Sequence, residues 1–266
     1  MSTLPLISII TVCYNSAATI EETILSVIGQ DYPHIEYIII DGGSNDETID
    51  IIKKYESHLS VWQSEPDKNM YDAINKGLTK VTGHLWMSLN SDDYFVSPKV
   101  VSLVAAYYSA NGSAYGAYYG NIIKKENNNF RKIKLFTTNF STLLASGHCT
   151  FMPQPSTFLL KEVIDTIGYF DLNYRYASDY DYFLRVTKAY KVKNIPQSFT
   201  VFRDHEGSIT NRLAKKMDEE RLQIIQKYIK ERQASFLILI KYTSWLYYLI
   251  LNRRFPLAKI FKFKTK

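Results

Sequence analysis

Apolar residues in the first ninety positions form short continuous runs that alternate with segments of helical spacing. Three β-branched, apolar runs predict strands buried on both faces, at residues 7–12, 36–40 and 85–89. Apolar positions at helical spacing predict helices at residues 17–28, 47–55 and 70–81, and a short strand is expected near Val61. This order predicts an α/β fold with a Rossmann-like, mostly parallel central sheet flanked by helices.

The pattern is weaker beyond residue 115. Strands are expected at residues 118–123 and 192–195, and a helix at residues 179–190. The polar residues 126–129 predict a turn or the tip of a hairpin. A charged helix is expected at residues 215–233.

Polar residues follow each of the three buried strands. Tyr14 and Asn15 come after the first strand, Asp41 ends the second, and Asp92 and Asp93 follow the third. Ligands of parallel sheets bind beyond the carboxyl ends of the strands, so these three stretches are expected to converge on one crevice.

The adjacent carboxylates Asp92 and Asp93 suggest a cation. A single Asp at a strand end, such as Asp41, is more often a turn or cap residue. Two neighbouring carboxylates after a buried strand repel each other unless a cation or hydrogen-bond donors offset the charge. A hard divalent cation with a substrate diphosphate is the natural partner.

Six motifs in order resemble the family 2 glycosyltransferases, which have the nucleotide-diphospho-sugar (GT-A) fold. They lie at residues 8–15, 41–46, 67–77, 89–93, 155–158 and 178–181. Each motif alone carries little information, but six in the expected order are a strong signal. The resemblance implies transfer of a sugar from a nucleotide-sugar donor, with a UDP-sugar favoured, to a hydroxyl group of an acceptor.

The resemblance also implies a role for individual residues. Those on the donor side are Thr11, Tyr14, Asn15, Asp41, Ser44, Asp67, Asn75, Lys76 and Asp92. Tyr14 would lie against the nucleobase, Asp41 would accept a hydrogen bond from it, and Asp67 would close over the donor. The residues implied on the acceptor side are Pro155, Ser156 and Thr157.

Asp179 matches the catalytic base of the family, although relatives often carry Glu-Asp where this chain has Ser178-Asp179. The base would take the proton of the acceptor hydroxyl while its oxygen attacks the anomeric carbon opposite the leaving phosphate, which is an inverting reaction. A glycoside hydrolase would instead need a facing acid and base. Asp181 is interpreted as a helix cap or a salt-bridge partner.

The metal implied by the resemblance is Mn²⁺ or Mg²⁺, held by Asp93 and Asp92, with His205 as a further candidate. Such an ion would offset the charge that grows on the leaving diphosphate. Many relatives carry Asp where this chain has Asn90, which leaves open which carboxylate binds directly. Asp93 is favoured for the metal, with Asp92 towards the ribose or the metal.

Other functions have less support. The family's Gln-x-x-Arg-Trp pattern of processive synthases is absent, which favours single transfers. A nucleotidyltransferase of related fold would carry a Gly-rich, Arg-containing loop where residues 13–17 stand. A non-catalytic, membrane-associated binding protein of this fold would not need Asp41, Asp93 and Asp179. A nucleic-acid partner is disfavoured because the basic C-terminal stretch is also apolar.

The C-terminal part differs in composition from the rest, so we expect a catalytic domain at residues 1–212 and a helical, apolar and basic segment at residues 213–266. The net charge is +6, and the last fifteen residues contain six Lys or Arg and no acid. Residues 236–251 are almost wholly apolar but shorter than the roughly 20 residues that span a bilayer. Binding at the membrane interface is favoured. Packing on the domain or on a second copy in a homodimer, and a true membrane span, are alternatives.

Two cysteines, Cys13 and Cys149, lie far apart and predict buried free thiols rather than a disulfide framework. The first residues do not resemble a secretory signal. We therefore expect a cytoplasmic protein, peripherally associated with the inner face of the membrane. A saccharide or lipid-linked saccharide acceptor in surface polysaccharide synthesis fits that location.

Overall fold

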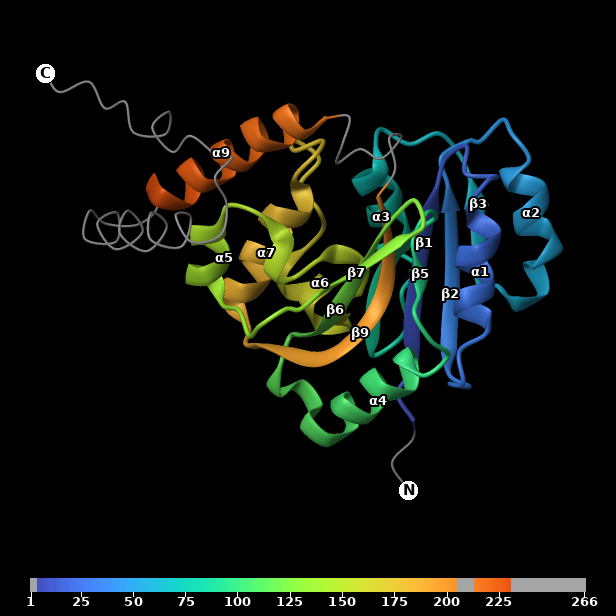
Figure 1. Ribbon diagram of the computed structural model, residues 1–266, viewed down its shortest axis with the longest axis horizontal. Helices are drawn as coiled ribbons and strands as arrows, with labels where there is room; N and C mark the ends of the chain where they lie inside the picture. The colour runs from blue at the N-terminus through green and yellow to red at the C-terminus, as the bar shows by residue number, and fades with distance from the viewer. Residues whose placement is uncertain (1–3, 205–212, 231–266) are drawn as a thin grey trace, which may run out of the picture.

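The computed structural model describes residues 4–204 and 213–230 (Figure 1). The strands are β1 (Ile7–Cys13), β2 (Ile35–Asp41), β3 (Val61–Ser64), β4 (Leu85–Asn90), β5 (Tyr94–Phe95), β6 (Ala117–Glu126), β7 (Asn129–Ile133), β8 (Thr157–Leu160) and β9 (Val192–Asp204). The helices are α1 (Ile20–Ile28), α2 (Thr48–Lys54), α3 (Met70–Leu78), α4 (Val100–Asn111), α5 (Phe140–Ser146), α6 (Lys161–Ile167), α7 (Ser178–Ala189) and α9 (Ala214–Lys230).

One twisted sheet organises the molecule, with strand order β3-β2-β1-β4-β8-β6-β9-β5 and β7 paired with β6. Strands β1 to β4 run parallel to one another, whereas β8 is antiparallel to both of its neighbours, β4 and β6. β6 therefore runs in the same direction as β4, and β9 is parallel to β6. The carboxyl ends of β1, β2, β4, β6 and β9 consequently meet at one edge of the sheet.

The predicted strands and helices of the first ninety residues are all present, with ends within three residues of the expected positions. β1 is buried throughout because α1 and α2 cover one face of the sheet and α3 covers the other (Figure 1). α3 lies close because Gly77 faces β1: a Cβ atom there would be 2.6 Å from Cγ2 of Ile10. The predicted α/β fold with a mostly parallel sheet is confirmed.

β9 is much longer than the strand expected at residues 192–195. Pro196 interrupts the pattern, because proline has no N–H to give to a strand partner. The structure accommodates it with two register shifts opposite Gly120 and Asn121, and the Asn121 amide donates to the Pro196 carbonyl at 2.9 Å. The strand therefore continues past the bulge to Asp204, at the same edge as the end of β4.

The segment predicted to bind the membrane lies outside the described residues. Within 4–204 and 213–230, no helix has the length and apolar character needed to cross a bilayer. Residues 236–266, on which the interfacial prediction rests, are not among them. The division at residue 212 stays a prediction, although Ile224 and Tyr228 of α9 pack into the same core as the sheet.

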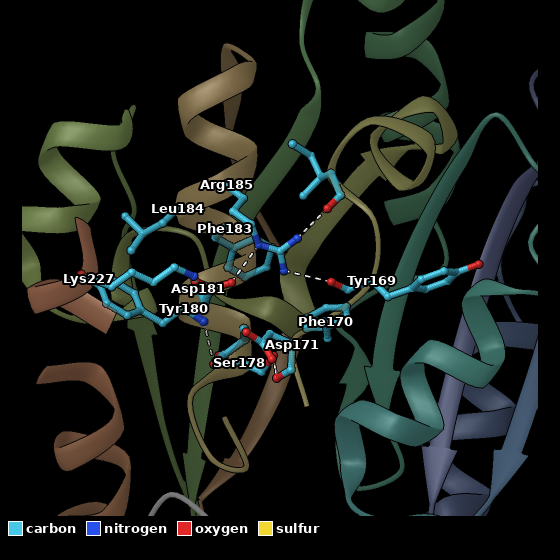
Figure 2. Close-up of polar contacts among 12 residues, drawn as sticks. Tyr169, Phe170, Asp171, Ser178, Tyr180, Asp181, Phe183, Leu184, Arg185 and Lys227 are labelled. Atoms are coloured by element: carbon cyan, nitrogen blue, oxygen red, sulfur yellow. Dashed lines mark hydrogen bonds and ion pairs between the residues drawn. The ribbon is translucent and has the colours of Figure 1, made fainter. Parts of the chain in front are cut away.

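A buried carboxylate joins α7 to α9 (Figure 2). Asp181 of α7 is 1% exposed and forms ion pairs with Arg185 at 2.8 Å and with Lys227 of α9 at 3.1 Å. The Tyr228 hydroxyl donates to the same carboxylate at 3.2 Å. Arg185 in turn donates to the carbonyl of Tyr169, in the loop before α7. The interpretation of Asp181 as a salt-bridge partner is confirmed.

Replacing Asp181 should destabilise the fold strongly. We expect Asp181→Ala to lower the free energy of unfolding by about 3–5 kcal/mol, because two partly buried cations lose their carboxylate. Asp165→Ala, an exposed carboxylate on α6, should stay within about 0.5 kcal/mol of the wild type. Urea unfolding of the three proteins measures both effects, and equal losses would contradict the assignment.

Candidate active site

Asp41 ends β2 and lies fully buried at the site edge. Its carboxylate accepts hydrogen bonds from the backbone N–H groups of Gly43 and Ser44 at 3.0 and 2.9 Å. The hydroxyl groups of Ser44 and Ser64 donate to it as well, at 2.5 and 2.6 Å. Burial alone would raise the pKa of Asp41, but these hydrogen bonds outweigh it and hold the pKa below its usual value. Asp41 is therefore an ionised anchor for the surrounding loops.

The turn after β1 presents an aromatic ring to solvent beside this anchor. Asn15 has a left-handed backbone, with φ of 49°, which asparagine tolerates better than most residues. Its N–H donates to the Ser44 hydroxyl at 2.8 Å, and its side-chain oxygen accepts from the N–H of Asn45 at 3.0 Å. Tyr14, just before the turn, is 60% exposed. Thr11, in contrast, lies inside the sheet, 3.0 Å from the Tyr37 hydroxyl.

Asp67 packs against the backbone that follows Asp41. A Cβ atom on Gly42 would lie 2.4 Å from Oδ2 of Asp67, so only glycine leaves room for this carboxylate. Burial raises the pKa of Asp67; the positive charge of Lys76 opposes this, while the charges of Asp72 and Asp41 add to it. The predicted convergence of the stretches that follow β1, β2 and β4 is also present: Asn15 donates to Ser44, and the hydroxyl groups of Ser16 and Ser91 lie 2.8 Å apart.

Two predicted donor residues on α3 make contacts within the protein. The Asn75 side chain both donates to the carbonyl of Phe170 and accepts from its N–H, each at 2.9 Å. Lys76 pairs with Glu65 at 2.9 Å and donates to the carbonyl of Pro66 at 2.8 Å. Asn75 therefore fastens the loop before α7 to α3, and Lys76 fastens the segment that carries Asp67.

The two carboxylates after β4 have different environments. Asp92 is partly exposed, whereas Asp93 is fully buried and accepts a hydrogen bond from the N–H of Arg203 at 3.1 Å. Burial, and next the charge of Asp92, raise the pKa of Asp93 well above its usual value. The Arg203 side chain pairs with Glu22 and lies over the ring of Tyr94, 4.9 Å from its centroid. Asp92 is therefore the more accessible of the two carboxylates.

The residues at this turn offer oxygen ligands to a divalent cation. Among the described residues, Oδ2 of Asp93 and Oδ1 of Asn90 are buried without a hydrogen-bond partner. Unpaired carboxylate and amide oxygens suit a hard cation. No group of three His, Cys, Asp or Glu side chains that could hold a metal ion occurs in the described part of the chain. His205 lies outside the described residues.

Asp179 lies in the first turn of α7 and is held by donors from other elements. The Tyr71 hydroxyl of α3 donates to its Oδ1 at 3.0 Å. The Cys149 thiol also hydrogen-bonds to this carboxylate; burial, followed by the charge of Asp179, raises the pKa of Cys149 well above its usual value. Tyr71 is likewise buried, and its raised pKa keeps it a donor. Asp179 itself stays partly exposed.

The predicted acceptor-side residues form the wall beneath the site. Pro155, Ser156 and Thr157 are buried. The Ser156 hydroxyl donates to the carbonyl of Gly120 at 2.9 Å, and the Thr157 hydroxyl to that of Pro153 at 2.7 Å. These two hydroxyl groups are therefore hydrogen-bonded within the protein.

Sequence reasoning missed Gln154 and Tyr71 as residues of the site. The Gln154 amide donates to the carbonyl of Ser88 at 2.9 Å, and its oxygen accepts from Asn90 at 3.3 Å. Tyr71 stood inside the motif at residues 67–77, but nothing in the pattern showed that it reaches a residue 108 positions further on. Both contacts depend on tertiary structure.

The comparisons with known proteins identify the family. The family model described as glycosyl transferase family 2 matches residues 8–168, which is more than half of the chain. The chain therefore belongs to glycosyl transferase family 2. Asp179 and α9 lie beyond the residues that the model matches.

Named relatives agree with this assignment. An uncharacterized glycosyltransferase of Mycobacterium tuberculosis is 31% identical over 189 residues, covering 70% of each chain. A PGL/p-HBAD biosynthesis glycosyltransferase of Mycobacterium bovis is 29% identical over 184 residues, covering 68% of this chain and 69% of the relative. The protein is accordingly a glycosyltransferase.

Solved structures confirm the GT-A fold. S. aureus TarS residues 1–349, in complex with UDP-GlcNAc, superposes with a TM-score of 0.74 at 16% identity, over 98% of this chain and 76% of TarS. The mannosyltransferase PcManGT of Pyrobaculum calidifontis, in complex with GDP-Man and Mn²⁺, gives a TM-score of 0.67 at 16% identity. That match covers 92% of this chain and 70% of PcManGT.

His148, next to the Cys149 that contacts Asp179, should make stability depend on pH. Burial, and next the positive charge of Arg221, lower the pKa of His148 from 6.5 to about 4. Between these values the unfolded chain binds the proton and the folded chain does not, so stability falls as the pH falls from about 6.5 to about 4. We expect His148→Gln to flatten this slope by up to about 1.4 kcal/mol per pH unit. Urea unfolding across this pH range measures it, and an unchanged slope would contradict the prediction.

Proposed function

We propose that this glycosyltransferase moves one sugar from a UDP-sugar to a hydroxyl group of a saccharide or lipid-linked saccharide acceptor. The reaction is inverting, metal-dependent and non-processive. The observation that carries the proposal is the hydrogen bond between Tyr71 and Asp179. It joins α3, which follows the donor-side motif at Asp67, to the residue that matches the base of the family.

The donor side of the proposal rests on the turns after β1 and β2. Tyr14 is an exposed ring next to a rigid turn, which suits stacking on a nucleobase. Asp41 orders the loop after β2 through its hydrogen bonds, and Asp67 packs against Gly42 in that loop. Solved structures of the same fold contain UDP-GlcNAc or GDP-Man. These features support a nucleotide-sugar donor.

A Mn²⁺ or Mg²⁺ ion at Asp92 and Asp93 is part of the proposal. Asp93, whose buried Oδ2 has no hydrogen-bond partner among the described residues, is proposed as the direct ligand, with the more accessible Asp92 towards the ribose or the metal. A divalent ion there would offset negative charge on the diphosphate leaving group. The PcManGT complex contains Mn²⁺, which supports the choice of ion.

Asp179 is proposed to take the proton of the acceptor hydroxyl. Its Oδ1 is occupied by the Tyr71 hydroxyl and by the N–H of Tyr180. These donors fix the orientation of the carboxylate. A general base acts efficiently when neighbouring groups hold it in a fixed orientation towards the proton that it takes.

Synthesis of surface polysaccharide at the cytoplasmic face of the membrane is the proposed setting. The apolar and basic sequence of residues 236–266 supports peripheral binding to an anionic surface. The name of one relative, PGL/p-HBAD biosynthesis glycosyltransferase, supports a biosynthetic setting. A non-catalytic binding protein would not need the buried donors that hold Asp179.

Removing the base should abolish transfer without releasing the donor. We expect Asp179→Asn to lower kcat by about 10²- to 10⁴-fold, because Asn cannot accept the proton, while the Kd for UDP stays the same. Asp165→Asn on the exposed face of α6 serves as the control and should transfer normally. Product formation and calorimetry measure the two quantities. Undiminished transfer by Asp179→Asn would remove it as the base.

The two carboxylates after β4 should respond differently to metal. We expect Asp93→Asn to abolish the gain in UDP affinity that Mn²⁺ gives to the wild type. Asp92→Asn, as a supporting residue, should weaken metal binding by about 10- to 100-fold. Calorimetric titration of UDP with and without Mn²⁺ compares the three proteins. The same Mn²⁺-dependent gain in all of them would place the metal elsewhere.

A further inference from the structure

Glu220 of α9 makes an unusual set of contacts with the loop before α7. Its carboxylate accepts hydrogen bonds from three consecutive backbone N–H groups, those of Arg175, Tyr176 and Ala177, at 2.9, 2.7 and 2.9 Å. Hydrogen bonds to a charged acceptor are about twice as strong as neutral ones. One side chain of α9 thus determines the course of three residues of this loop.

The loop that Glu220 holds leads directly into the proposed base. Ala177 is the N-cap residue of α7, and Asp179 is the second residue of that helix. The carbonyl of Tyr176 also lies 3.3 Å from the Tyr71 hydroxyl, the same group that donates to Asp179. A shift of residues 175–177 would therefore move the start of α7 and also the Tyr71 hydroxyl, which donates to Asp179.

A second contact fixes α9 in the position that Glu220 requires. Lys227 and Tyr228, two turns further along α9, bind the buried carboxylate of Asp181 on α7 (Figure 2). The two contacts lie on either side of Asp179 in the sequence. Because both are made by α9, the helix clamps the first turn of α7 from outside.

We propose that Glu220 is a positioning residue for the transfer reaction, and that α9 completes the site of the catalytic base. Glu220 acts through the loop at residues 175–177 and touches neither Asp179 nor, in the proposed reaction, the donor. The inference rests on the proposed role of Asp179. It assigns a function in catalysis to a helix beyond residues 8–168, the part that the family model matches.

Kinetics of Glu220→Gln in the full-length protein test the proposal. Gln keeps the size of the side chain but loses the charge that binds three N–H groups. We expect kcat to fall by about 10- to 100-fold, since a misplacement of about 1 Å can have that effect, while the Kd for UDP changes less than about twofold. Glu220→Ala should lower kcat further, and Glu220→Asp should recover part of the loss.

The neighbouring Glu219 offers a matched control. It is exposed on the same helix turn, and Glu219→Gln should leave kcat unchanged. Hydrogen exchange of the amides of residues 175–177 gives a readout independent of activity: it should be faster in Glu220→Gln and unchanged in Glu219→Gln. In an Asp179→Asn background, adding Glu220→Gln should not lower the residual rate further, because both act through the same base.

The outcomes separate this inference from the proposed function. If the wild type transfers sugar and Glu220→Gln does so at the same kcat, α9 has no positioning role and the inference is wrong. A parallel rise of the Kd for UDP and fall of kcat would show general loss of structure and also overturn it. A wild type without transfer activity towards any nucleotide-sugar would instead refute the proposed function itself.

Discussion

The buried carboxylate of Asp41 is the constraint around which the site edge is built. A charge without contact to solvent is tolerated only where nearby groups donate hydrogen bonds to it. The donors are the loop after β2 and the Ser64 hydroxyl at the end of β3, so satisfying one carboxylate fixes two chain segments. Asp67 packs against the backbone at Gly42, in the loop that these hydrogen bonds hold. The segments around Asp41 are thus held together by the protein's own hydrogen bonds.

Helix α3 connects the segment of Asp67 to Asp179. It begins at Met70, three residues after Asp67, and its first turn is capped by the Asn69 side chain. One turn holds Tyr71, which donates to Asp179, and the next holds Asn75, which fastens Phe170 in the loop before α7. One short helix therefore sets the position of Asp179 relative to the segment of Asp67, while Glu220 of α9 holds the loop before α7.

Much of the fold could be predicted from the sequence because its strands are buried on both faces and its helices are amphipathic. The sequence also predicted that Asp41 and Asp92 lie at one edge of the sheet, because each follows a strand and the strands were expected to be parallel. Contacts between distant residues could not be predicted in this way: the partners of Asp179 and the bonds of Glu220 depend on how the second half of the chain folds back. Asn75 and Ser156 matched family motifs, yet their side chains bind the protein's own backbone. A motif gives the location of a residue more reliably than the direction of its side chain.

The contact between Glu220 and residues 175–177 also has a consequence for the order of events during synthesis. Residue 220 follows the loop it holds by 43 to 45 positions. Because a chain emerges from the ribosome N-terminal end first, the sheet and the turns around Asp41 have their partners long before this loop does. The region of Asp179 is consequently among the last to reach its final form, and a nascent chain that ends before α9 has the segments around Asp41 but lacks the side chain that holds residues 175–177.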